Sequence, residues 1–145
     1  MATPLHADHL QPSDVPAVLD VLRTTPIIGV LGDVAGAANG TLVAAYKAPC
    51  AGILEDPFII LTTPPGSGTM TVNVRKNGSS VLSATMDVAS GASGAALTVH
   101  GAFSSDAAKT VAQGDIIAIT VDATGTGSTF NLSAAVSFKA LGRTA

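Results

Sequence analysis

The sequence predicts an all-β fold, an antiparallel β-sandwich of jelly-roll type that follows a short N-terminal arm. Polar and apolar residues alternate in several short segments, which is the pattern of half-buried strands. Turn-forming residues recur about every 8 to 12 residues, a spacing typical of sandwiches and barrels. Hydrophobic residues make up 47% of the 145 residues but aromatic residues only 3%, so aliphatic side chains must fill a thin core. We expect one sandwich domain at residues 41–145 and an arm at residues 1–40.

The arm contains one predicted amphipathic helix, at about residues 14–23. A serine and an aspartate can cap its first turn, and Pro26 ends it. Residues 27–31 then form a brief apolar run, and residues 32–40 are a linker of small residues. A helix of about ten residues is marginal alone in water, so its apolar stripe must pack on its own domain or on a neighbour. The stripe follows an i, i+3, i+4, i+7 spacing and consists of Val15, Val18, Leu19 and Leu22.

The clearest strand signals lie in the middle and at the end of the chain. Residues 69–75 alternate with period two, which points Met70, Val72 and Val74 toward the core. In the last segment five apolar residues share one face, namely Phe130, Leu132, Ala134, Val136 and Phe138. With the weaker patterns included, we expect strands at 41–48, 53–62, 69–75, 81–88, 96–103, 116–121 and 129–141.

Glycine, asparagine and proline mark the turns between these strands. Asn77-Gly78 is the strongest short hairpin signal, since both residues tolerate the positive φ of a type I′ turn. Gly114-Asp115 predicts a tight turn in which the Asp115 carboxylate accepts backbone hydrogen bonds. Pro57 follows two acidic residues and indicates a bend at a sheet edge, where charge discourages unwanted strand pairing.

Four segments occur in an order that resembles a known module. They are residues 46–53 (YKAPCAGI), 68–78 (GTMTVNVRKNG), 113–116 (QGDI) and 130–132 (FNL). The series resembles a β-sandwich module of tailed-bacteriophage virion proteins, and it extends over residues 41–141, roughly two-thirds of the chain. Asn73 stands where the module commonly has an aspartate. Proteins with this module include head decoration (cement) proteins and parts of tails or fibres.

The resemblance implies a structural virion protein. Such a protein would decorate and stabilise the outer surface of a phage capsid by binding the major capsid protein, as a homotrimer made in the host cytoplasm. The alternative is a tail or fibre module that recognises a host surface or glycan, although the chain has no Trp and one Tyr to stack on a sugar. The arm is similar to those with which capsid decoration trimers grip their neighbours. The predicted partner-binding residues, for a capsid protein or a neighbouring subunit, are therefore Val15, Val18, Leu19, Leu22, Ile27, Ile28 and Val30.

No group of residues in the sequence supports catalysis, and we expect no enzyme, no cofactor and no metal site. His6, Asp8 and His9 could be drawn as a metal site, but a structural zinc site takes four ligands. We expect them to form a polar tail. His100 has no nucleophile elbow nearby and is expected at the surface or in an interface.

Three other features also have simple structural explanations. Glu55 and Asp56 are adjacent, so an extended backbone points them to opposite faces, which does not suit a carboxylate pair acting on one glycosidic bond. The Gly-Thr-Gly at residues 125–127 has no helix after it, as a phosphate loop requires. Cys50, the single cysteine, can form no intrachain disulfide, and its apolar neighbours predict a buried, inert thiol.

Charge narrows the range of partners. The net charge is −3 and the seven Lys and Arg residues are scattered, which argues against a nucleic-acid surface. The longest apolar window is interrupted by charges and prolines, so we expect no membrane partner. Charged residues make up only 12% of the chain, which predicts a surface that is partly covered by other proteins.

Overall fold

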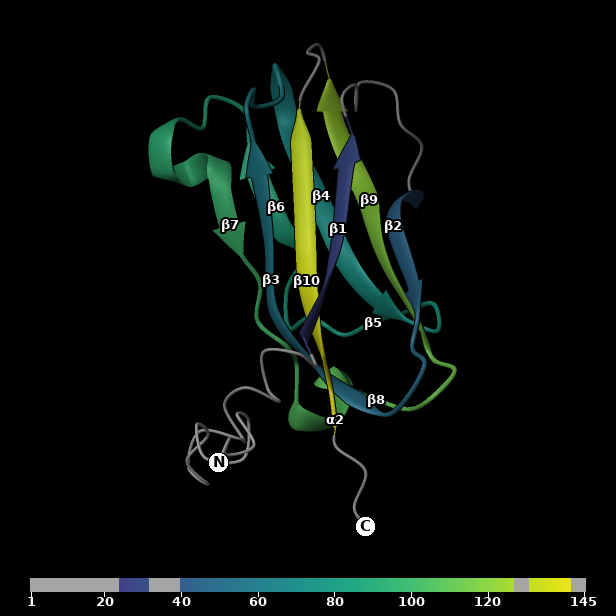
Figure 1. Cartoon of the computed structure of the whole chain (residues 1–145). Helices are drawn as coiled ribbons and strands as arrows, with labels where there is room; N and C mark the ends of the chain where they lie inside the picture. Colours follow the sequence, from purple (N-terminus) through teal and green to yellow (C-terminus); the bar gives the residue numbers. More distant parts are fainter. Residues whose placement is uncertain (1–23, 32–39, 127–130, 142–145) are drawn as a thin grey trace, which may run out of the picture.

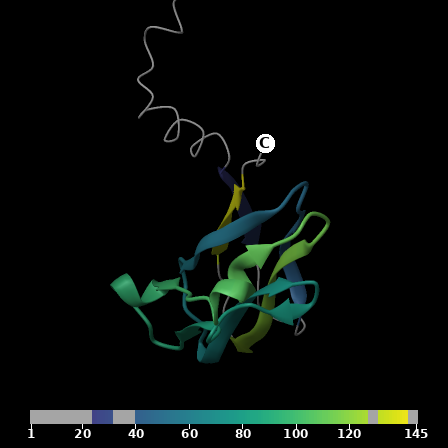
Figure 2. The same ribbon diagram turned by 90° about the horizontal axis from the view of Figure 1, so that it is seen from below.

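The protein is an antiparallel β-sandwich, seen in Figures 1 and 2 as a computed structural model. The structure describes residues 24–31, 40–126 and 131–141, and within them ten strands form two sheets. Sheet A has the order β1 (Thr24–Leu31), β10 (Leu132–Ala140), β3 (Gly52–Leu61) and β7 (Thr98–His100), with β8 (Thr110–Val111) also paired to β3. Sheet B has the order β2 (Thr41–Lys47), β9 (Ile116–Thr126) and β4 (Ser67–Lys76), with β5 (Ser79–Ser80) and β6 (Met86–Ala89) both paired to β4.

The first four strands alternate between the two sheets along the chain. Strands β1 and β3 belong to sheet A, whereas β2 and β4 belong to sheet B. The last two long strands then insert between them, β9 between β2 and β4 and β10 between β1 and β3. This interleaved antiparallel order is that of a jelly roll. The predicted fold class is therefore confirmed.

Aliphatic side chains fill the space between the sheets, as the composition requires. Met70, Val72 and Val74 on β4 are all 0% exposed, which confirms the predicted alternation. The predicted inner face of β10 is also confirmed for Leu132, Ala134, Val136 and Phe138, while Phe130 lies outside the described residues. Phe138 is the largest fully buried side chain among the described residues.

The edges of the two sheets meet in pairs, which closes both sides of the sandwich. Strand β1 lies against β2, and β6 lies against β7. Gly29 permits the first of these contacts, because a Cβ atom there would lie 2.6 Å from both Val43 Cγ1 and the Val43 carbonyl oxygen. Edge strands that face each other are poor templates for pairing with a further chain. Any association of this protein is therefore expected to use its faces.

Strand β1 places residues 24–31, which we had grouped with the arm, inside the sandwich. It pairs with β10 along its whole length, from Thr24 opposite Lys139 to Leu31 opposite Leu132. Pro26 is compatible with this position because β1 is an edge strand. The predicted helix and linker, in residues 1–23 and 32–39, lie outside the described residues.

Strand β3 bends at the predicted position, but it lies between β10 and β7 and is not the expected edge strand. Its pairing with β10 shifts there, so that Asp56 and Pro57 on β3 together face one residue of β10. Asp56 adopts a positive φ of 49°, as the extra residue of such a bulge often does. Pro57 suits the bulge because it has no N–H to leave unpaired. Its carbonyl accepts a hydrogen bond of 2.8 Å from the Gly101 N–H.

The hairpin after β4 has the predicted turn but a shorter returning strand. Asn77 and Gly78 have φ angles of 51° and 87°. The expected strand at 81–88 is wrong in its first half, because Val81 and Leu82 are 2% and 6% exposed. Two consecutive inward side chains do not fit an unbroken strand of period two. Likewise, the expected strand at 96–103 is reduced to β7 after the 3-10 helix η1 (Gly94–Leu97).

The turn at Gly114 holds the lower end of the sandwich together. Gly114 has the expected positive φ of 88°. The two oxygens of Asp115 each accept a hydrogen bond of 2.8 Å, one from Asn77 Nδ2 and one from the backbone N–H of Ala112. These donors lower the pKa of Asp115 below its ordinary value of 3.8. The predicted turn role of Asp115 is confirmed.

A short helix near this turn was not predicted. Helix α2 (Asp106–Lys109) is capped by Ser105, whose Oγ accepts a 3.0 Å hydrogen bond from the Ala108 N–H. At its other end, Lys76 Nζ donates to the carbonyl of Thr110 at 2.7 Å. The cation at the C-terminal end of the helix is also favourable for the helix dipole.

Candidate protein-binding surface

The outer face of sheet A carries two cross-strand rows without a charged residue. Directly opposite residues in paired antiparallel strands share a face of the sheet. The first row consists of Ile28, Ala135, Phe58 and His100, from β1, β10, β3 and β7. The second row consists of Val30, Ser133, Ile60 and Thr98, from the same strands. We call these eight residues the apolar face.

The large aliphatic side chains of the apolar face are open to solvent in the single chain. Val30 is 70% exposed and Ile28 is 61% exposed, the two highest values for large hydrophobic residues in the described parts of the chain. The next, Leu42 at 56%, is opposite Thr120 on sheet B. Ile60 is 43% exposed. Contiguous exposed apolar residues of this kind are typical of docking surfaces.

Charged side chains on this side of sheet A lie away from the apolar face. Glu55 is opposite Ser137, and Lys139 is opposite Ile53, both nearer to the end of β10 where the chain leaves the sheet. A partner confined to these two rows can therefore cover the apolar face without removing a charge from water, which would be costly.

His100 forms the rim of the apolar face, which agrees with its expected exposed position. Its ring centroid lies 5.9 Å from that of Phe58, with an interplanar angle of 42°. This is within the range of favourable aromatic pairs. The contact with His100 helps to keep Phe58 half-buried and fixes its ring on the sheet.

The predicted partner-binding residues have separate locations. Ile28 and Val30 point outward on the apolar face, but Ile27 is 5% exposed and belongs to the core, because alternation along β1 turns it inward. The other four, Val15, Val18, Leu19 and Leu22, lie outside the described residues. Sequence analysis missed Phe58 and Ile60. Residues 58–61 are all apolar, so a period of two does not show which pair faces outward.

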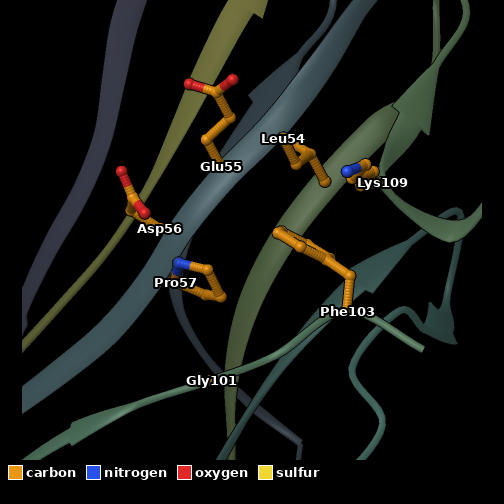
Figure 3. Close-up of a pocket in the computed structure, with 7 residues that line it drawn as sticks. All are labelled: Leu54, Glu55, Asp56, Pro57, Gly101, Phe103 and Lys109. Atoms are coloured by element: carbon orange, nitrogen blue, oxygen red, sulfur yellow. The ribbon is translucent and has the colours of Figure 1, made fainter. Parts of the chain in front are cut away.

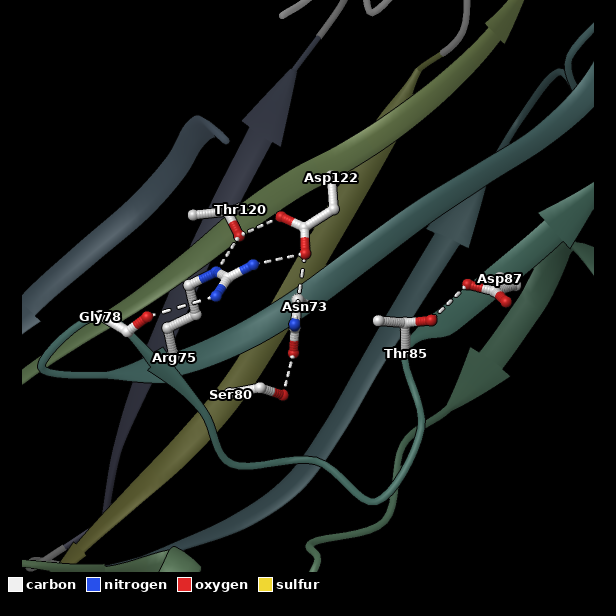
Figure 4. Close-up of polar contacts among 8 residues, drawn as sticks. All are labelled: Asn73, Arg75, Gly78, Ser80, Thr85, Asp87, Thr120 and Asp122. Carbon is white, nitrogen blue, oxygen red and sulfur yellow. Dashed lines mark hydrogen bonds and ion pairs between the residues drawn. The ribbon is translucent and has the colours of Figure 1, made fainter. Parts of the chain in front are cut away.

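The middle of the outer face of sheet B is polar, and its side chains bind one another (Figure 4). Arg75 Nη2 and Asp122 Oδ2 form an ion pair at 2.6 Å, and Arg75 Nε donates to Thr120 Oγ1 at 3.2 Å. Asn73 Nδ2 donates to Asp122 Oδ2 at 3.2 Å, and Asn73 Oδ1 accepts from Ser80 Oγ at 2.8 Å. Asn73 is only 4% exposed. We call these five residues the polar network.

A cleft of about 480 Å³ lies beside the bulge of β3, on the side facing β7 and α2. Figure 3 shows the Phe103 ring directed into the space between Leu54 and Pro57, while Glu55 and Asp56 extend away from Phe103. Lys109 lies on the rim and forms an ion pair of 3.0 Å with Asp106. The cleft therefore has no converging pair of carboxylates.

Two other predicted features can be placed. Cys50 is half-buried, not fully buried as expected, because it lies in the turn between β2 and β3 at the end of the sandwich. The ring of Tyr46 lies 5.4 Å from that of Phe138 and packs against the core. In the described residues, no group of three or more His, Cys, Asp or Glu could hold a metal ion. His6, Asp8 and His9 lie outside those residues.

No family model matches the chain, and no curated protein matches it. Among solved structures, the fold is similar to the native structure of a family 35 carbohydrate-binding module from Clostridium thermocellum. The match has 16% sequence identity and a TM-score of 0.40, and covers 80% of this chain and 99% of that chain. No helix in the described ranges is long and apolar enough to cross a membrane.

Proposed function

We propose that this chain is a structural virion protein that decorates the outer surface of a phage capsid. It would stabilise the capsid by binding the major capsid protein, as a homotrimer. The apolar face is the observation that carries this proposal. A lone subunit holds Ile28 and Val30 in water, whereas a neighbouring protein surface would cover them. The order of motifs that resembles virion proteins indicates which kind of assembly the neighbour belongs to.

Stabilisation of a capsid by such a protein follows from mass action. A protein that binds the assembled lattice and not the free subunits adds its own binding free energy to the stability of the lattice. Fully burying an aliphatic side chain contributes about 1.5–3 kcal/mol before the costs of ordering and association. Linking three such subunits raises the avidity without any new kind of contact.

Binding to empty heads of the phage that encodes this chain tests the proposal. We expect the full chain to cosediment with heads assembled without it, to saturate at a fixed stoichiometry, and to raise their melting temperature. A chain carrying Ile28→Asp and Val30→Asp should lose this binding, because it places two charges on the apolar face. The matched control is Ile116→Asp, which adds a charge at another exposed isoleucine, 50% exposed, on sheet B.

The location of the chain on the virion decides between head and tail. Labelled chain on the head surface supports decoration. No binding to heads, together with label on the tail or fibres, would overturn the proposal in favour of a host-binding module.

A further inference from the structure

We propose that the apolar face is the receptor for the N-terminal stripe of a second copy of this chain. The stripe, Val15, Val18, Leu19 and Leu22, is the apolar side of the predicted helix. A short helix is marginal without a surface to pack on, and the apolar face is exposed without a cover. Both surfaces belong to the same chain, so a second copy supplies what each of them needs.

The dimensions of the apolar face fit one short helix. Four strands place the ends of each row about 14 Å apart, and the two rows are about 7 Å from each other. A stripe with i to i+7 spacing extends over about 10 Å of a helix that is about 10 Å wide. The two rows cover on the order of 200 Å², an area that the four side chains of one stripe can cover.

The chain connection favours docking on another copy over docking on the same copy. Thr24 is already paired with Lys139 in the sheet, and only Arg23 separates it from Leu22. A stripe that folded back on its own sheet would have to reverse direction within that one residue. Connections between helices and strands usually take about 2–6 residues. Docking on a second copy requires no reversal.

The resulting contact joins two different surfaces, stripe to face. Contacts of this heterologous kind build closed rings when the rotation between subunits closes, and open chains when it does not. A ring of three would be the homotrimer of the proposed function. This inference rests on the proposed function and deepens it by naming the contact between subunits. Charges on the apolar face would then weaken capsid binding because they break the trimer and remove its avidity.

Complementation between two full-length variants tests this contact in the absence of capsids. Leu19→Asp breaks the stripe and leaves the face intact, whereas Val30→Asp breaks the face and leaves the stripe intact. We expect the unaltered chain to self-associate, and each variant alone to do so more than about tenfold more weakly. A mixture of the two variants should form a one-to-one heterodimer through the one intact stripe and the one intact face. Native mass spectrometry with one variant isotopically labelled measures this directly.

The other arrangements give different results. A chain whose stripe folds onto its own face would be a monomer, and mixing would produce no heterodimer. If two apolar faces packed together, Leu19→Asp would still self-associate. Either result overturns the inference, as does a monomeric unaltered chain. Ile116→Asp is the control and should self-associate normally.

The variants must fold, and the two proposals must be able to fail separately. Val30 is 70% exposed, so Val30→Asp should fold, and circular dichroism checks this; if it does not fold, Ile60→Asp breaks the second row instead. Failure of this contact is also distinguishable from failure of the proposed function. Head binding without self-association would overturn the contact between copies and keep the proposed capsid decoration. Self-association without head binding would overturn capsid decoration and keep the contact between copies.

Discussion

The apolar face of sheet A and the polar network of sheet B have opposite chemistry. On sheet A, the apolar face presents Ile28, Val30 and Ile60 to water, and none of these side chains has a polar group to satisfy. On sheet B, the polar network links Arg75 to Asp122 at 2.6 Å and buries Asn73 to 4% exposure. Both faces belong to one jelly roll.

Because of this difference, we expect stability and association to depend on different residues. A polar network whose donors and acceptors bind one another is complete within the subunit, and its members stabilise the fold. An exposed apolar face contributes little to the fold of the single chain, because it gains free energy only when a second surface covers it. We therefore expect changes on sheet B to affect stability alone and changes on the apolar face to affect association alone.

Gly29→Ala should produce the largest effect, because it acts where the edges of the two sheets meet. Its Cβ would lie 2.6 Å from the Val43 carbonyl oxygen, a backbone atom that cannot turn aside. We expect the free energy of unfolding to fall by about 3 kcal/mol, measured by denaturant titration. Adding Val43→Ala removes the clash with Cγ1 but not the clash with the carbonyl, so it should restore only part of the loss. Full restoration would show that the backbones can move apart.

Asp122→Ala should have an intermediate effect on stability and none on association. It leaves Arg75, Thr120 and Asn73 without the carboxylate that they share. Leaving such partly buried groups unsatisfied costs about 2 kcal/mol, which thermal unfolding would show. Adding Arg75→Met removes the unpaired charge and should recover part of the loss. A change in self-association of the folded variant would contradict the separation of the two faces.

The sequence predicted the two-layered fold correctly, but it did not predict the edge strand β1. Alternation at residues 69–75 predicted β4 correctly, because one of its faces is buried and the other is polar. Strand β1 was missed because its outward residues Ile28 and Val30 are as apolar as the inward Ile27. Alternation cannot be read where both faces of a strand are apolar. The same ambiguity hid Phe58 and Ile60.

The apolar face is therefore made of the residues whose pattern did not predict strand β1 or the outward side of β3. A strand with apolar side chains on both faces is normally buried on both, yet β1 has only the core on one side. Pairing across the sheet, which brings β1, β10, β3 and β7 into two rows, is a long-range property that no local pattern contains. For the same reason, the predicted site included Ile28 and Val30 but not the β3 side chains that complete it.

The smallest effect is expected at the lower end of the sandwich, which belongs to neither face. Asn77 Nδ2 and the Ala112 N–H donate to Asp115 and lower its pKa below 3.8. Because the folded pKa is the lower one, the carboxylate stabilises the fold above about pH 3.8, and this contribution is lost as the pH falls through the folded pKa.

Asp115→Asn should therefore lower the melting temperature at pH 7, and the difference from the unaltered chain should narrow as the pH falls below 3.8. The matched control is Asp87→Asn, whose exposed carboxylate accepts a 2.8 Å hydrogen bond from Thr85 Oγ1. A difference for Asp115→Asn that stays constant over the whole pH range would show that the turn depends on the shape of the side chain and not on its charge. Self-association should not change in either variant, since both positions lie outside the apolar face.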